Sequence, residues 1–173
     1  MINVSSVANV GVHRTCTPLY EKYEATPYNT FLDPADTTNI YTGMVMYRTG
    51  PDMVQNAGSG ASVVNGKPFG LSAMDRNPNI DDITQVGVNT WAVWLGGSNA
   101  FFTVTAPAFD TTQAYSITTS GTRTILYTAS GTGQLTSVSG VATTLASVPV
   151  AELIDVISPT QIVIRLIPFG ATA

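Results

Sequence analysis

Cations, cysteine and long apolar runs are all scarce in this sequence, and each scarcity excludes a class of protein. Lys and Arg together account for only 7 of the 173 residues, and the formal net charge is −4. A protein that binds DNA or RNA directly needs clustered cations to displace counterions, so direct nucleic-acid binding is excluded. The single cysteine, Cys16, leaves no intrachain disulfide. No stretch approaches the roughly 18 apolar residues of a membrane-spanning helix.

Charge of either sign is also scarce. Charged residues make up 10% of the chain, against about 25% in an average domain, while hydrophobic residues make up 44%. This composition excludes disorder, and the hydroxyl-rich remainder suits β-structure and a surface largely covered by other subunits. The first ten residues, MINVSSVANV, lack the basic and apolar regions of a secretory signal, which indicates synthesis in a cytoplasm.

Short apolar runs separated by turn signals predict an all-β fold, either a small β-sandwich or a barrel. The run TWAVWL at residues 90–95 is apolar on both faces, which predicts a fully buried strand. Trp91 and Trp94 lie on its opposite faces, and we expect one in the core and the other at a subunit contact. Hairpin turns are predicted at Asn65-Gly66 and around Pro159. No segment has the pattern of an amphipathic helix of ten or more residues, and at most a turn or two of helix is expected at residues 78–83.

The first 38 residues differ from the rest, because neither strand nor helix periodicity persists in them and they contain three prolines. We predict an irregular, extended N-terminal arm over residues 1–38, followed by a single β-domain over residues 39–173. A small β-domain has little room in its core for the aromatic side chains of this arm: Tyr20, Tyr23, Tyr28 and Phe31. Exposed aromatic clusters mark interfaces, so these four residues are the predicted partner-binding site. The alternative is that the arm folds back and buries them locally.

Two groups of residues invite a metal-binding interpretation, and neither is complete. Four oxygen-bearing side chains alternate as at the start of a calcium loop: Asp75, Asn77, Asn79 and Asp81. That loop needs Gly at its sixth position and a bidentate Glu at its twelfth, where this chain has Ile80 and Val86. We therefore interpret the segment as a shaped polar loop. His13 and Cys16 have the spacing of a zinc pair, but the chain has no other His or Cys to complete the site.

Catalytic motifs are incomplete as well. A serine triad would have to use His13, the only histidine, and residues 58–62 lack the third glycine of a dinucleotide loop and the lysine of a P-loop. A glycosidase needs two carboxylates across a cleft, whereas carboxylates on strands are usually solvated. The candidates for such a pair are Asp81, Asp82, Asp110, Glu152 and Asp155. We predict no catalytic residues, no cofactor and no metal, so the protein is not expected to be an enzyme.

The order of the motifs resembles that of the head decoration, or cement, proteins of tailed bacteriophages. The resemblance covers about residues 42–167 and rests on these segments in sequence: TGMVMYRTG, GKPFGLSAMDRNPNIDD, TWAVWLGG with FFTVTAPAFD, GTRTILYTASGTGQLT and VAELIDVISPTQIVIRLI. It implies a β-rich structural virion protein, made in the host cytoplasm, that binds the outer surface of an expanded capsid. There it would clamp major capsid subunits, acting as a homotrimer. The resemblance carries no catalytic residues.

Two other functions remain open at this level. One is a phage tail-tube or head–tail joining subunit, since these are also β-rich and self-assemble. The other is a receptor- or carbohydrate-binding module, which clustered exposed Trp and Tyr around one pocket would favour.

Overall fold

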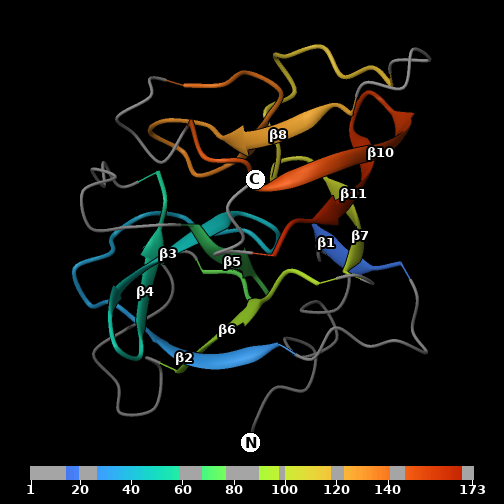
Figure 1. The fold of residues 1–173 in the computed structure, drawn as a ribbon. Helices are drawn as coiled ribbons and strands as arrows, with labels where there is room; N and C mark the ends of the chain where they lie inside the picture. Colours follow the sequence, from blue (N-terminus) through green and yellow to red (C-terminus); the bar gives the residue numbers. More distant parts are fainter. Residues whose placement is uncertain are drawn as a thin grey trace, which may run out of the picture.

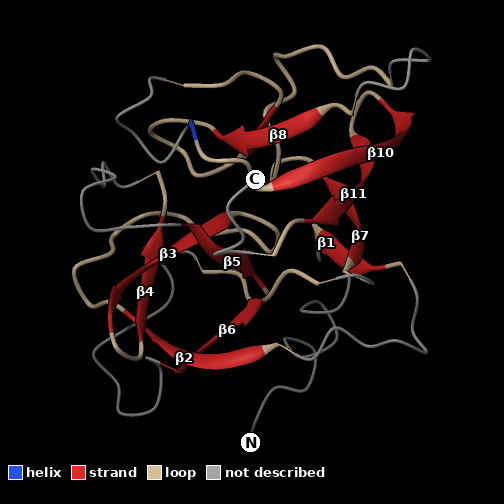
Figure 2. Cartoon of the chain, in the orientation of Figure 1, coloured by secondary structure: helices blue, strands red, loops and turns tan. Residues whose placement is uncertain are grey.

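The computed structural model describes residues 15–19, 27–58, 68–76, 90–97, 100–117, 123–140 and 147–168. Apart from a short 3-10 turn at Ser147, the blue segment in Figure 2, these residues form strands and connecting loops, which confirms the prediction of an all-β fold. The predicted turn at Asn65-Gly66 and the helical turn at residues 78–83 lie outside the described residues.

Five strands close into a barrel, which occupies the lower left of Figure 1. In sequence order they are β2 (Tyr28–Leu32), β3 (Val45–Gly50), β4 (Met53–Asn56), β5 (Pro68–Ser72) and β6 (Thr90–Trp94). Around the barrel the order is β2-β4-β3-β5-β6, and the ring closes because β2 pairs in parallel with β4 and antiparallel with β6. Closure leaves no open edge on this sheet.

The other six strands form a curled sheet that lies against the barrel, toward the upper right of Figure 1. They are β1 (Cys16–Pro18), β7 (Phe101–Thr105), β8 (Ile125–Thr128), β9 (Leu135–Thr136), β10 (Ala151–Ser158) and β11 (Gln161–Leu166). Their order in the sheet is β1-β7-β11-β10-β8-β9. The hairpin predicted around Pro159 is confirmed, because β10 and β11 pair antiparallel up to Ser158 and Gln161.

Side chains along a barrel strand point alternately into the barrel and out of it, and they form two separate hydrophobic cores. In β3, Val45 and Tyr47 face the six-stranded sheet, while Met46 between them points into the barrel. The core between barrel and sheet includes Phe102 and Leu126, among other buried side chains of the sheet. One wall of the barrel therefore contributes to both cores, as the period-2 geometry of a strand requires.

Strand β6 is buried at Trp91, Val93 and Trp94, whereas Thr90 at its start and Leu95 just after it are exposed. The prediction of a fully buried strand therefore holds only for its centre, which places a tryptophan in each core. Trp91 packs inside the barrel and Trp94 packs between the barrel and the sheet. The expectation that one of them lies at a subunit contact is wrong, because both side chains are at least nine-tenths buried. A strand shared by two cores needs large apolar side chains on both faces, which explains the uninterrupted apolar run.

Two strands lie within the segment predicted as an irregular arm. β1 pairs antiparallel with β7, and β2 forms part of the closed barrel. Residues 16–18 and 28–32 therefore belong to the two sheets, and the division of the chain at residue 38 stays a prediction. Three and five residues are too short for a period-2 pattern to be visible, and the prolines sit at the ends of these strands or beyond them.

Candidate interaction surfaces

Asp75 has a clear structural role. Its Oδ1 accepts hydrogen bonds from the backbone N–H and, at 2.6 Å, from the hydroxyl of Thr42. Next to it, Ile40 and Arg76 exchange backbone hydrogen bonds of 2.9 and 2.8 Å. These contacts fasten the loop after β5 to the loop before β3, in agreement with its interpretation as a shaped polar loop. Asn77, Asn79 and Asp81 lie outside the described residues.

Within the described ranges, no group of three or more His, Cys, Asp or Glu side chains is arranged to hold a metal ion. Cys16 is buried, and burial raises the pKa of its thiol, so the sulfur remains protonated at neutral pH. His13, the other residue of the rejected zinc pair, lies outside the part of the chain that is described.

The buried carboxylate of Asp36 is a feature that sequence reasoning missed. Its Oδ1 accepts hydrogen bonds from the N–H and the hydroxyl of Thr38, at 2.9 and 2.7 Å. Its Oδ2 accepts the Asn56 N–H at 2.6 Å, and Arg76 donates to its backbone carbonyl at 2.6 Å. Asp36 thus joins the loop after β2 to the end of β4 and to the loop after β5.

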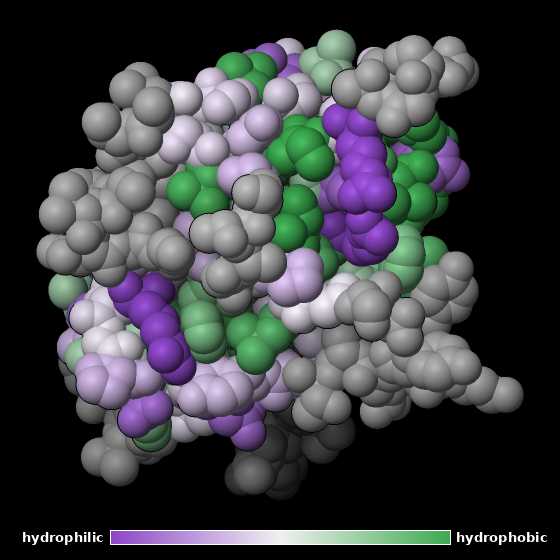
Figure 3. Space-filling model, in the orientation of Figure 1, coloured by the Kyte–Doolittle hydropathy of each residue, from purple (hydrophilic) through white to green (hydrophobic). Residues whose placement is uncertain are grey.

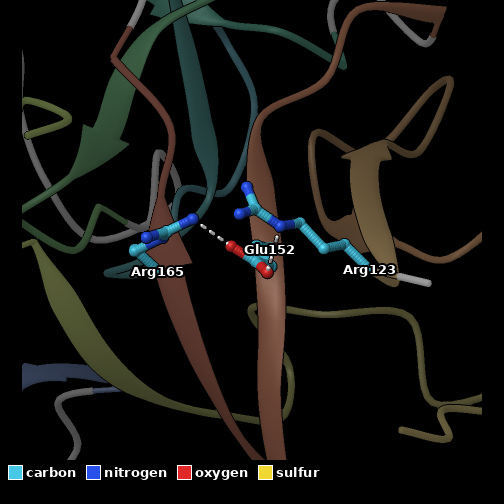
Figure 4. A network of polar contacts seen from close by, with 3 residues as sticks. All are labelled: Arg123, Glu152 and Arg165. Carbon is cyan, nitrogen blue, oxygen red and sulfur yellow. Dashed lines mark hydrogen bonds and ion pairs between the residues drawn. The ribbon is translucent and has the colours of Figure 1, made fainter. Parts of the chain in front are cut away.

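Three of the five carboxylates considered for catalysis are described. Each of them contacts an arginine, a threonine or a backbone N–H. Glu152 lies between Arg123 and Arg165, with 3.4 Å between Arg123 Nε and Glu152 Oε1 (Figure 4). Hydrogen bonds from Thr112 hold the pKa of Asp110 below its usual value. Asp155 accepts the N–H of the next residue, Val156, at 2.8 Å. These contacts give no support for a glycosidase pair among the three carboxylates. Asp81 and Asp82 lie outside the described residues.

The Arg123–Glu152–Arg165 cluster lies on the outer face of the six-stranded sheet. Glu152 of β10 pairs in register with Arg165 of β11, and Arg123 precedes β8. In Figure 3 a hydrophilic band crosses the surface in the region of β10 and β11, with hydrophobic surface on both sides. The Arg123 side chain is exposed and that of Glu152 is largely covered, and ion pairs at a protein surface contribute about 0–1 kcal/mol to stability, so the cluster mainly makes this face polar.

Two of the four predicted partner-binding aromatics are described, and they point to opposite faces of β2. Tyr28 pairs with Val93, whose side chain lies inside the barrel, so its ring is directed to the barrel end. There it packs edge-to-face on Phe69 with 5.6 Å between ring centroids, and the Arg48 guanidinium lies 4.4 Å from the Phe69 centroid. Both described aromatics are partly exposed. Tyr20 and Tyr23 lie outside the described residues.

Phe31 lies on the outside of the barrel, where its side chain is 49% exposed. Its register partners are Met53 on β4 and Thr90 on β6, and Asn29 precedes it by two residues on the same face. All four side chains are exposed and uncharged. We call Asn29, Phe31, Met53 and Thr90 the outer wall patch.

Three comparisons of the chain with known proteins bear on its identity. Among curated proteins and among solved structures, no significant match is found. The model of a family described as phage cement protein matches residues 1–173, the whole chain. No helix within the described ranges is long and apolar enough to cross a membrane. The match confirms the resemblance seen in the order of the sequence motifs, and the chain belongs to the family of phage cement proteins.

Proposed function

We propose that the protein binds the outer surface of an expanded phage capsid and stabilises the shell by clamping neighbouring major capsid subunits. Membership of the cement family makes it a structural protein of the phage capsid, and the capsid is its place in the virion. The proposal adds the outer position, the partner and the clamping action. The family match favours this role over the tail-tube, head–tail joining and carbohydrate-binding alternatives.

The observation that carries the clamping role is the divergent orientation of Tyr28 and Phe31. One side chain reaches the barrel end and the other the outer wall, although both are on β2. A clamp needs contact surfaces that face two neighbours, and aromatic residues are favoured at such surfaces because they combine large apolar area with few rotatable bonds. The proposal assigns the same role to Tyr20 and Tyr23.

The proposed unit on the capsid is a homotrimer made in the host cytoplasm. A chain with only 10% charged residues has a surface suited to burial against other copies. Three chains of 18.2 kDa make a closed assembly of about 55 kDa. Light scattering at increasing protein concentration and imaging of decorated shells test this, and monomers alone in solution together with isolated single copies on the shell would contradict it.

The experiment for the capsid role uses expanded, undecorated shells of the virus that encodes the chain. The protein should co-sediment with the shells, saturate at a fixed ratio to the major capsid protein, and raise the temperature at which the shells break. Unexpanded shells are the matched control and should bind less. Saturating binding without any change in shell stability would contradict clamping, and absence of binding would contradict the capsid role.

A further inference from the structure

We infer that the outer wall patch (Asn29, Phe31, Met53 and Thr90) is the surface that docks on the capsid, and that its partner there is an apolar protein surface bordered by basic side chains. This inference rests on the proposed function. It names the face of the protein that makes the contact and the chemistry of the subunit surface that receives it.

The first support is the composition of the patch. Phe31 and Met53 are direct cross-strand neighbours, 49% and 37% exposed, on strands that pair in parallel. Both side chains therefore lie on the outer face of the barrel, on neighbouring strands. Asn29 and Thr90 add uncharged polar groups. Aromatic residues and methionine are enriched at the centre of protein interfaces and charged residues are depleted there.

The second support is rigidity. The Phe31 N–H donates to the Asp52 carbonyl at 2.8 Å, and the Thr30 hydroxyl donates to the same carbonyl at 2.7 Å. On the other face of β2, Thr30 and Leu32 are buried. The backbone that presents Phe31 is therefore fixed by a closed barrel before binding, and little conformational entropy is lost when a partner covers it.

The third support is the charge at the border. Asp33 follows β2 and Asp52 precedes β4, so the chain places one acidic residue two positions after Phe31 and another directly before Met53. Strands β2 and β4 contain no Lys or Arg, and Arg48 on the neighbouring strand β3 has its guanidinium over Phe69 at the barrel end. An apolar centre with acidic borders is complementary to an apolar surface with basic borders, which speeds association and fixes orientation.

The outer face of the six-stranded sheet is less suited to docking. Its centre holds Arg123, Glu152 and Arg165, whose charges are compensated within the chain. Covering this cluster would remove the exposed guanidinium of Arg123 and the partly exposed one of Arg165 from water without a new partner, and such desolvation opposes binding. The barrel wall can be covered without that cost.

Binding to expanded shells of the same virus, measured by co-sedimentation at several salt concentrations, tests the inference. Phe31→Ala and Met53→Ala should each weaken binding about 30-fold, the loss typical of a hot-spot side chain. Ile157→Ala is the matched control, since Ile157 is 54% exposed on β10 in the other sheet, and its binding should equal that of the wild type. Asp52→Asn should slow association and reduce its salt dependence. Melting curves should show that all four variants fold.

The outcomes separate the two proposals. If the wild-type protein does not bind shells, the proposed function fails and this inference fails with it. If the wild type binds and the Phe31 and Met53 variants bind equally well, the docking surface is wrong while the function stands. If these variants change only the size of the protein in solution, the patch joins copies of this chain, which also overturns the inference.

Discussion

Replacing Asp36 with alanine should destabilise the protein far more than the same change at Asp110, although both residues begin the same triplet, Asp-Thr-Thr. In both, Oδ1 accepts the N–H and the hydroxyl of the second threonine, at 2.9 and 2.7 Å for Thr38 and at 3.0 and 2.6 Å for Thr112. The two sites differ in burial. Asp36 is 0% exposed and also accepts the Asn56 N–H, whereas the hydrogen bonds of Asp110 are exposed to water.

The magnitude follows from the donors that lose their acceptor. Asp36→Ala removes the acceptor of two backbone N–H groups, those of Thr38 and Asn56, and a buried donor without a partner costs about 1–3 kcal/mol. Because the Asn56 bond is buried and the Thr38 bond only part-buried, the free energy of unfolding should fall by about 3 kcal/mol. For a chain of this size that lowers Tm by about 6–12 °C. In Asp110→Ala, water can replace the carboxylate as the hydrogen-bond acceptor. The free energy of unfolding should therefore fall by less than about 1 kcal/mol.

Thermal unfolding of the two variants, followed by circular dichroism at neutral pH, measures the difference directly. Chemical denaturation with unchanged m-values would show that both variants start from the same compact state. Equal losses at the two positions would refute the reasoning, because the local hydrogen bonds would then account for the whole effect and burial for none of it.

Two further predictions concern the β8–β9 region. Gly133→Ala should lower the free energy of unfolding by clearly more than Gly131→Ala: both have positive φ, which costs a Cβ about 1–2 kcal/mol, but only at Gly133 would that Cβ lie 1.9 Å from Asn56 Oδ1. Equal losses in chemical denaturation would count against this close approach. Burial raises the pKa of Tyr115, and the Asp110 charge raises it further. The contribution of the Tyr115 hydroxyl to folding stability is therefore complete below the unfolded tyrosine pKa of about 10 and is lost as pH rises further. Stability measured from pH 8 to pH 11 should therefore decline less in Tyr115→Phe, and an identical decline would exclude Tyr115 as the cause.

The sequence predicted those elements whose signals are local. The apolar run of β6 and the turn around Pro159 each specify their structure within a few residues, and both were found. The resemblance to cement proteins also rests on local segments in a fixed order. These signals are strong because a buried strand or a tight turn restricts nearly every residue in it.

Pairings between distant segments could not be predicted in this way. The barrel closes through a parallel pairing of β2 with β4 that involves only two residue pairs, and no local pattern specifies it. Nor does the sequence distinguish the buried Asp36 from the exposed Asp110, since their triplets are identical. At the candidate site, Phe31 remains a prediction, and Met53 was missed because a methionine after a turn carries no signal until register places it beside Phe31.

The position of β11 has a consequence for the order of folding. β11 is the last described strand in the sequence, yet it lies inside the six-stranded sheet, between β7 and β10. During synthesis β7 and β10 are complete before their shared neighbour exists, and each then has an unpaired edge open to other chains. The sheet can therefore close only after residue 166 has been made, through non-local pairings that form slowly. A chain interrupted just after β10 would keep two separate open edges rather than form a smaller sheet.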